Sequence, residues 1–327
     1  MENYDQDYWQ NELFYAVENY DADDVQNVLD HGADANIKSP DDDYALYAAL
    51  KQNTNRGNKI ASVLIDAMTT ESIQDFDSHP LRITENIGLI DKLLDKGAKL
   101  NESDCLIWAS NPETLQHLID KGADVNQYLT NKKGGFLSNV RGGNLENVKV
   151  FVENGVNITE AHAVEWALSG GKREIADYLL EQTKGQVSNI NECAIYSAGN
   201  EYLDLLEKFH KQGADINTEN NDILETASRR NNAAIARYVL ENTNVSADDQ
   251  EKSLKAGIDN YEIVALFLVE RKYKPTADTK AWIDENAKGH IKDLVAKADL
   301  FERLNQKPQK ATQATTKDKS QTFKHKI

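Results

Sequence analysis

The sequence predicts an all-α protein built from stacked pairs of short helices, and two observations lead to this prediction. A phrase of the form Gly-Ala-Asp-x-Asn recurs behind apolar segments, and helix-turn-helix patterns precede it. Three stretches keep it in full, "VLDHGADANI" (28–37), "LIDKGADVNQ" (118–127) and "FHKQGADINT" (209–218), and two more are near copies, "LLDKGAKLNE" (93–102) and "FVENGVNITE" (151–160). Such self-similarity is the signature of a repeat architecture, in which each repeat buries its apolar stripe against its neighbours.

The clearest repeat spans residues 134–158. A short apolar segment around Phe136 and Val140 meets a turn at Gly142–Asn144, and a second segment runs up to Gly155. The second segment carries apolar residues at the spacing of one buried helical stripe; these are Leu145, Val148, Phe151 and Val152. We expect Gly155, like the glycine of each other copy, to end its helix in the left-handed conformation.

Two further stretches repeat this layout. Residues 162–182 place Gly170-Gly171 between two apolar segments, and residues 222–242 place Asn231-Asn232 at the same point. Asparagine tolerates left-handed backbone nearly as well as glycine does, so both pairs predict a tight turn between helices.

These repeats resemble those of the ankyrin family. The resemblance implies two antiparallel helices per repeat, a glycine that ends the second helix, and an Asp and an Asn that satisfy backbone groups in the next turn. The apolar residue between them (Ala35, Val125 or Ile216) would point into the stack. The family's Thr-Pro-Leu-His opening is degraded, as in "NELF" (11–14), "YALY" (44–47) and "HAVE" (162–165), and only "HPLRI" (79–83) keeps Pro-Leu. In the short fourth repeat, Pro112 suits the first turn of the second helix.

The resemblance covers residues 1–306 and predicts a curved ankyrin-repeat α-solenoid of about ten helix-turn-helix units. The approximate spans are 10–37, 38–70, 71–102, 103–127, 128–158, 159–190, 191–217, 218–246, 247–276 and 277–306. The last span should be a polar cap with an uncommonly long, charged second helix. Residues 307–327 are poor in apolar residues and rich in Lys, Thr and Gln, which predicts a disordered basic tail.

Charge is unevenly distributed along the chain. The formal net charge is −17, but residues 306–327 hold six lysines and one aspartate, a net of +5, which leaves −22 for the rest. So acidic a body repels nucleic acid. This surplus of negative charge would either attract a protein with a basic surface or keep the chain soluble.

The sequence predicts no membrane span, because no apolar run approaches the required length. The acidic, aromatic start "MENYDQDYWQ" is unlike a secretory signal, so we expect a cytoplasmic protein. Cys105 and Cys193 lie at positions where a buried, small apolar residue is expected. The sequence therefore indicates neither a disulfide framework nor a metal site.

Catalytic motifs are not found in the sequence. It holds no P-loop, no dinucleotide fingerprint, no HExxH and no GxSxG, and "GGKRE" (170–174) falls in a turn between helices. The acidic runs at 21–24 and 41–44 do not follow EF-hand spacing. We therefore expect no cofactor and no enzymatic activity. A cysteine–histidine pair stays open as an alternative, since its members would meet only in the fold.

Partner contacts in ankyrin-like proteins come from loop tips and from the exposed face of the first helices. Carried over to this sequence, the resemblance selects Asp41, Asp42, Asp43, Tyr44, Tyr128, Lys132, Lys133, Glu160, His162, Glu165, Glu219, Asn220 and Asn221. Among these, Tyr44 and Tyr128 are the strongest candidates, because exposed aromatic residues dominate binding hot spots. For Tyr44, packing at a helix cap is the alternative. Trp9 is a further candidate at the N-terminal end, whereas Trp108 and Trp166 are expected in or beside the stack.

The sequence therefore predicts a non-enzymatic, monomeric scaffold that binds another protein. One setting is a bacterial effector delivered into a host cell, with the tail as its export address. The other is an inhibitor, such as an immunity or anti-defence protein, whose acidic surface blocks a basic site. An enzyme with a catalytic unit in the least regular stretches, 68–88 or 247–306, is the alternative from another class.

Overall fold

The computed structural model describes residues 6–19, 21–39, 43–75, 79–129, 134–217 and 223–305, and in these ranges the chain is all-α. An isolated antiparallel bridge joins Lys38 to Tyr44, and no strand occurs in the described ranges. The all-α prediction is confirmed. The chain divides into two compact units, an N-terminal unit of Met1–Asn189 and a C-terminal unit of Ile190–Ile327.

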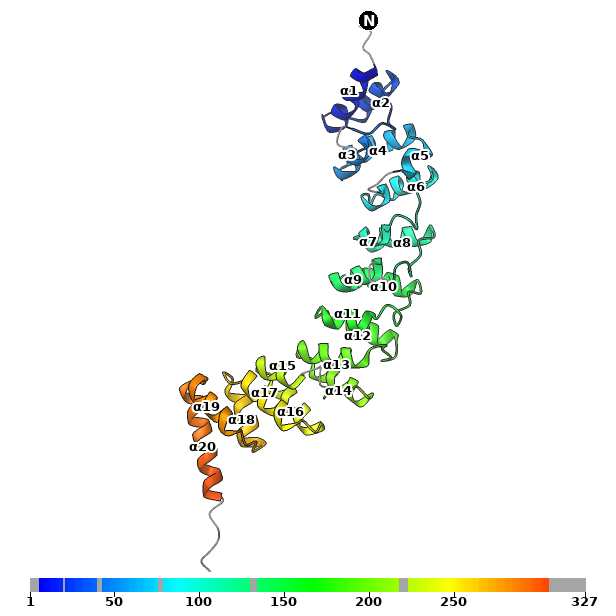
Figure 1. Ribbon diagram of the computed structural model, residues 1–327. Coiled ribbons are helices and arrows are strands. Elements are labelled where there is room, and N and C mark those ends of the chain that lie inside the picture. Colours follow the sequence, from blue (N-terminus) through cyan, green and yellow to red (C-terminus); the bar gives the residue numbers. More distant parts are fainter. Residues whose placement is uncertain are drawn as a thin grey trace, which may run out of the picture. The chain divides into compact units, whose positions relative to one another are not determined.

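The N-terminal unit is a succession of short helices (Figure 1). Their bounds are α1 Gln6–Asn19, α2 Ala22–Asp30, α3 Ala45–Lys51, α4 Asn55–Ala67, α5 Thr70–Gln74, η1 Pro80–Arg82, α6 Ile87–Asp95, α7 Cys105–Trp108, α8 Pro112–Asp120, α9 Gly135–Gly142, α10 Leu145–Glu153, α11 Ala163–Ser169 and α12 Arg173–Gln182. The pairs α1 and α2, α3 and α4, α9 and α10, and α11 and α12 pack together. First helices also pack on first helices, as α7 on α9 and α9 on α11, and second helices on second helices, as α8 on α10.

The C-terminal unit continues the same layout. Its helices are α13 Ile190–Gly199, α14 Leu203–Lys211, α15 Ile223–Arg229, α16 Ala233–Asn242, α17 Ala247–Ala256, α18 Tyr261–Ala265, the π-helical turn η2 Leu266–Glu270, α19 Ala277–Asn286 and α20 Gly289–Asn305. Helix α20 has 17 residues and is the long, charged final helix that the sequence predicts. The polar cap is only partly realised, because Leu300 and Phe301 near its end are 57% and 67% exposed.

The glycine of the repeated phrase ends its helix in all five copies. The φ angles of Gly32, Gly97, Gly122, Gly155 and Gly213 lie between 83° and 106°, as the sequence predicts. After α8, the Gly122 amide donates to the Ile119 carbonyl (2.8 Å) and the Ala123 amide to the Leu118 carbonyl (3.0 Å). This pair of bonds is the Schellman motif, and it satisfies carbonyls that the end of a helix leaves without partners.

The turns between paired helices also follow the prediction. Gly143, Gly171 and Asn231 have φ angles of 85°, 64° and 59°. In the shortened fourth repeat, Pro112 is the first residue of α8, and the Asn111 side chain accepts a hydrogen bond from the Thr114 amide (2.8 Å). A proline at this position costs no hydrogen bond, because the first amides of a helix have no partner within it.

Asparagine side chains link successive loops of the phrase. Oδ1 of Asn36 accepts from the Thr69 amide (2.7 Å), Oδ1 of Asn101 from the Asp124 amide (2.9 Å) and Oδ1 of Asn126 from the Asn157 amide (2.8 Å). Within the loop after α8, the Asp124 carboxylate accepts from the Asn126 amide (2.9 Å). Each Asn thus ties its own loop to the one that follows, and we call these bonds the asparagine rungs.

Buried apolar side chains run through both units. In the N-terminal unit, Phe136 of α9 and Phe151 of α10 are fully buried, with ring centroids 5.6 Å apart. The apolar residues Ala35 and Ile216 between the Asp and Asn of the phrase are 2% exposed and point into the stack, whereas Val125 is only half-buried.

Candidate functional site

Tyr44 is buried, so of the two alternatives, an exposed loop tip and packing at a helix cap, the structure shows the second. The residue is 6% exposed and directly precedes α3. Its hydroxyl lies 3.4 Å from the Asp75 carboxylate, and the Lys38 ammonium lies 5.3 Å from its ring centroid. Burial, followed by the charge of Asp75, raises the pKa of Tyr44 above its ordinary value. Tyr44 therefore packs at the start of α3, and its neighbour Asp43 is the exposed residue there.

Tyr128 does lie at a loop tip. It is 37% exposed, has a φ angle of 60°, and lines a small crevice with Asp104 and Ile107. The crevice brings the loop tip after α8 next to the first helix of the same repeat, α7. Tyr128 therefore keeps the exposure that a partner contact requires.

The predicted residues at the start of α11 are partly engaged within the chain. Glu160 is exposed, and its carboxylate accepts from the Asn157 side chain (2.9 Å). His162 has a φ angle of 52°, and its Nδ1 lies 2.7 Å from the Ser188 hydroxyl. The Glu165 carboxylate accepts from the Asn189 side-chain amide (2.6 Å). These side chains hold neighbouring loops together, which leaves Glu160 as the most accessible of the three.

Seven of the predicted contact residues lie outside the described ranges, as does the tail. They are Asp41, Asp42, Lys132, Lys133, Glu219, Asn220 and Asn221, and the tail is residues 307–327. Trp9 is described and is half-buried, with its ring stacked on His31 at a centroid distance of 4.5 Å.

Trp108 is an exposed aromatic residue that sequence reasoning did not select. Its spacing predicted a place in or beside the stack, and it lies on α7, which packs on α9, with a side chain that is 59% exposed. Helix α7 has only four residues, and Cys105, Leu106 and the following Ala109 occupy its buried side. On so short a helix, Ile107 and Trp108 are left on the other side, facing outward. The sequence feature that could have indicated the exposure of Trp108 is the short length of the repeat at 103–127.

An arginine–tryptophan stack lies on the next two first helices. The guanidinium carbon of Arg141, on α9, lies 4.0 Å from the ring centroid of half-buried Trp166, on α11. Because α7 packs on α9 and α9 on α11, Trp108 and this stack lie on three consecutive first helices. We call Trp108, Arg141 and Trp166 the first-helix strip.

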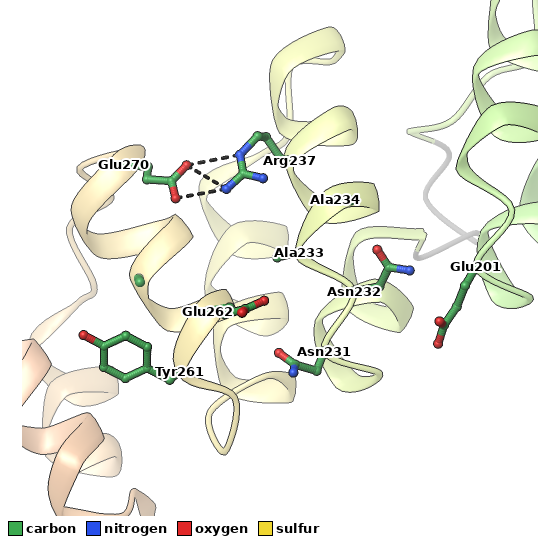
Figure 2. A pocket seen from close by; sticks show the side chains of 10 residues that line it. Glu201, Asn231, Asn232, Ala233, Ala234, Arg237, Tyr261, Glu262 and Glu270 are labelled. Atoms are coloured by element: carbon green, nitrogen blue, oxygen red, sulfur yellow. Dashed lines mark hydrogen bonds and ion pairs between the residues drawn. The ribbon is translucent and has the colours of Figure 1, made fainter.

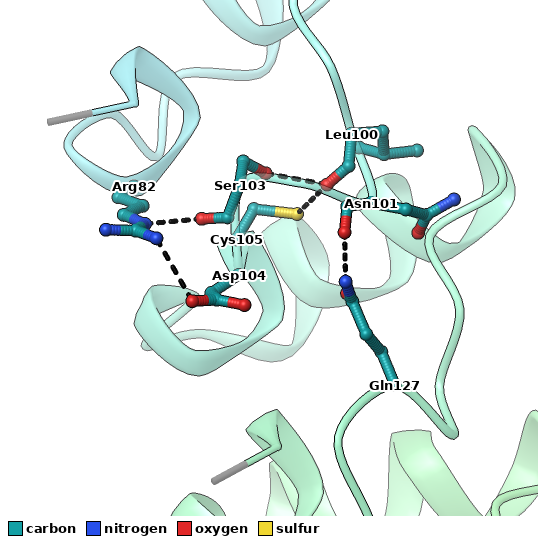
Figure 3. Close-up of polar contacts among 7 residues, drawn as sticks. All are labelled: Arg82, Leu100, Asn101, Ser103, Asp104, Cys105 and Gln127. Carbon is teal, nitrogen blue, oxygen red and sulfur yellow. Dashed lines mark hydrogen bonds and ion pairs between the residues drawn. The ribbon is translucent and has the colours of Figure 1, made fainter. Parts of the chain in front are cut away.

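The start of α7 is fixed by polar contacts (Figure 3). Arg82 of η1 donates to the Ser103 carbonyl and forms an ion pair with the Asp104 carboxylate (3.0 Å). The Ser103 hydroxyl donates to the Leu100 carbonyl (2.6 Å), and Gln127 donates to the Asn101 carbonyl. These contacts orient the single turn of α7 and therefore Trp108 at its end.

Both cysteines are buried. Cys105 is 2% and Cys193 is 0% exposed, and the Cys105 thiol donates to the Leu100 carbonyl at 3.6 Å. Burial raises the pKa of the Cys105 thiol above its ordinary value. A buried thiol that is harder to ionise is a poor nucleophile, because the thiolate is the reactive form.

An open depression of about 650 Å³ occurs in the C-terminal unit (Figure 2). It is lined by Asn231 and Asn232 of the turn before α16 and by Tyr261 and Glu262 of α18. At one side Arg237 donates to both carboxylate oxygens of Glu270, each at 3.0 Å. Both side chains of this ion pair are partly exposed, and the pair joins α16 to η2. The bond to Glu270 accounts for the presence of Arg237 at the depression, and no ligand is needed to explain it.

Metal and membrane features were also sought among the described residues. They contain no group of three or more His, Cys, Asp or Glu side chains that could hold a metal ion. No helix formed by them is both long enough and apolar enough to cross a membrane. No protein-family model matches the chain, and no curated protein matches it either.

Proposed function

We propose that this protein is a non-enzymatic ankyrin-repeat solenoid of about ten units, which binds another protein through the first-helix strip of its N-terminal unit. The recurrent helix pairs, the left-handed glycine that begins each phrase and ends the helix before it, and the asparagine rungs support the ankyrin assignment. Helix pairs stacked in this way offer side chains of many repeats to one partner.

The exposure of Trp108 carries this proposal. A tryptophan that is 59% exposed leaves a large apolar surface in water. Tryptophan, tyrosine and arginine are the residues that most often dominate protein–protein binding energy. The first-helix strip holds two tryptophans and one arginine, and Tyr128 lies beside Ile107, the neighbour of Trp108.

The three helices that carry the first-helix strip differ in charge from the chain as a whole. Helices α7, α9 and α11 contain only two charged residues, Arg141 and Glu165, and are therefore neutral in sum. The whole chain has a net charge of −17. A partner that docks here would be recognised mainly by apolar and aromatic contact, with the acidic surroundings favouring an approach by a basic protein.

The burial of both cysteines supports the non-enzymatic part of the proposal. Cys105 and Cys193 were the candidate nucleophiles of the enzyme alternative, and each is at most 2% exposed. The described parts of the two least regular stretches are helical as well: 68–75 holds α5, 79–88 holds η1 and the start of α6, and 247–305 holds α17 to α20 with η2.

Affinity capture with the full chain tests the proposal. Trp108→Ala should weaken binding of the captured partner by at least about 30-fold, the size of a hot-spot loss. Tyr261→Ala is the matched control, because Tyr261 is 52% exposed but belongs to the C-terminal unit. Binding of the purified partner would then be measured by calorimetry. Equal affinities of the wild type and Trp108→Ala would refute the strip as the binding surface.

The salt dependence of the same complex separates the two biological settings that the sequence left open. An acidic inhibitor that blocks a basic partner should lose affinity steeply between about 0.05 and 0.5 M salt. It would use acidic tips such as Asp43 and Glu160. A host-protein effector that binds through the strip should be less sensitive, and deletion of residues 307–327 should abolish its delivery but not its binding.

A further inference from the structure

An apolar groove bordered by lysines lies near the end of the C-terminal unit. It has a volume of about 500 Å³ and is formed by η2, the loop 271–276, α19 and α20. Leu268, Leu294, Val295 and Phe301 are among its apolar residues. Lysines line it from three segments, and these are Lys272 and Lys274 of the loop, Lys280 of α19 and Lys297 of α20. We call this site the lysine groove.

Apolar side chains are also exposed at the groove, where Val269 and Phe301 line it, and next to it, where Leu300 lies outside the lining. Leu300 and Phe301 are consecutive on α20 and are 57% and 67% exposed, and Val269 of η2 is 52% exposed. Phe301 has the largest exposed fraction of the large apolar residues that the structure describes. Exposed apolar patches with a polar rim mark interaction sites with proteins or membranes.

The described residues around the groove are weakly basic, in contrast to the rest of the chain. Residues 271–305 hold eight Lys and Arg against six Asp and Glu, a net of +2, whereas residues 1–270 carry −24. At the groove itself the acidic lining residue is Asp299, whose carboxylate is paired with the Lys280 ammonium (2.9 Å). Lys272 and Lys297 are exposed. An occupant of the groove must therefore be anionic as well as apolar.

Three candidate partners of the groove are residues 306–327 of the chain itself, an acidic peptide and a lipid membrane. The first two fit these observations less well than the membrane does. Residues 306–327 of the chain itself carry a net charge of +5 and would be repelled by the lysines. An acidic peptide could fill the groove, but it would leave Leu300, which is outside the groove lining, in water. A lipid interface would receive the groove rim and the projecting side chains together.

We propose that the lysine groove and the end of α20 bind the surface of an anionic lipid bilayer. Leu300 and Phe301 insert at the level of the headgroups, and Lys272 and Lys297 contact lipid phosphates and carboxylates. Such peripheral binding combines buried apolar area with attraction to anionic lipids. The six lysines of residues 306–327 add attraction to the same surface, while the acidic remainder of the chain is repelled by it.

Vesicle co-sedimentation with the full chain tests this site. Vesicles of phosphatidylcholine alone would be compared with vesicles that contain about 30% phosphatidylserine, a typical anionic membrane composition. The wild type should bind only the anionic vesicles and should be released by about 0.5 M salt. Failure to bind anionic vesicles, or equal binding to neutral ones, would overturn the proposal.

Substitutions of exposed residues test whether the vesicles bind at the groove. The double variants Leu300→Ser with Phe301→Ser, and Lys272→Glu with Lys297→Glu, should each reduce vesicle binding by about tenfold or more. Tyr261→Ser and Lys211→Glu are matched controls, because both are exposed side chains of the same unit outside the groove, and they should bind like the wild type. Circular dichroism would verify that each variant is folded.

A tail variant completes the design. Replacing all six lysines of residues 306–327 by glutamine should weaken binding without abolishing it. If this variant loses all binding while both groove variants bind like the wild type, the groove has no part in the contact and the proposal is wrong.

Discussion

The loop after α8 and the loop after η2 both lead the chain out of the second helix of a pair, but different residues hold them. After α8, Gly122 takes the left-handed conformation, Asp124 caps the turn, and Asn101 of the preceding loop binds the Asp124 amide. After η2, the left-handed residue is Lys272, with a φ angle of 54°. The Tyr273 amide still donates to the Phe267 carbonyl (2.9 Å), so the turn is similar although its glycine is missing.

Long-range side chains replace the phrase in the second loop. The Tyr273 hydroxyl donates to the Ala247 carbonyl (3.1 Å) and lies 3.3 Å from the Glu251 carboxylate. The hydroxyls of Thr276 and Thr279 also donate to Glu251. The comparison teaches that a loop can be fixed either by a local sequence phrase or by one carboxylate on the first helix of the same repeat, α17.

The largest expected effect is the removal of that carboxylate. Glu251→Ala should lower the free energy of unfolding by about 2 kcal/mol, because it leaves the buried Thr279 hydroxyl without its acceptor and frees the loop. Urea denaturation would measure the loss. Glu262→Ala, at an exposed position of the same repeat, should change stability by less than about 0.5 kcal/mol. Equal effects of the two substitutions would contradict the role of Glu251.

The next effect tests the phrase itself. Gly122→Ala should destabilise by about 1 kcal/mol, since the φ angle of 102° strains any residue with a Cβ atom. An added Cβ at Gly122 meets no atom within 4 Å, so backbone strain alone is measured. At Gly142 the Cβ is equally unobstructed and φ is not positive, so Gly142→Ala should be neutral or stabilising. Thermal unfolding of the two variants gives the comparison, and a loss at Gly142 as large as that at Gly122 would refute the explanation.

Restoring the glycine in the second loop should have a smaller effect of opposite sign. Lys272→Gly should stabilise the chain by about 0.5 kcal/mol, because relief of the left-handed strain exceeds the added entropy of the unfolded chain. Urea denaturation would again give the value. A destabilised Lys272→Gly would mean that the lysine side chain contributes more to folding than its backbone strain costs.

The effect that is smallest at neutral pH is a change in pH dependence. Burial, followed by the charge of Glu251, raises the pKa of Tyr273 from 10.0 to about 12. The protonated phenol is thus favoured by folding, and its contribution is complete below pH 10 and is lost as pH rises through about 12. The wild type should therefore lose stability in this window relative to Tyr273→Phe. Urea denaturation at about pH 9 and about pH 11 would measure both slopes, with Tyr261→Phe as the control, and parallel slopes for wild type and Tyr273→Phe would contradict the prediction.

The local features of the fold could be predicted from the sequence. The all-α class, the left-handed glycines and the turn at Asn231 follow from residues that are neighbours in the chain. The left-handed Lys272 and the role of Glu251 could not be predicted, because they depend on contacts between residues more than twenty positions apart.

The candidate site was harder to predict than the fold. For Tyr44 the sequence left an exposed tip and packing at a helix cap open, and the residue is buried at the start of α3. Trp108 was expected in or beside the stack, and its side chain is exposed. Periodicity could decide neither position, because Tyr44 precedes its helix and α7 has only four residues. A periodic pattern needs several turns before it fixes a buried side.

The asparagine rungs have a consequence for solvent exchange. The amides of Thr69, Asp124 and Asn157 belong to exposed residues, yet each donates to an asparagine of the preceding loop. Deuterium can replace such a hydrogen only when the two loops separate. These surface amides therefore act as natural reporters of how far an opening in one repeat spreads into the next.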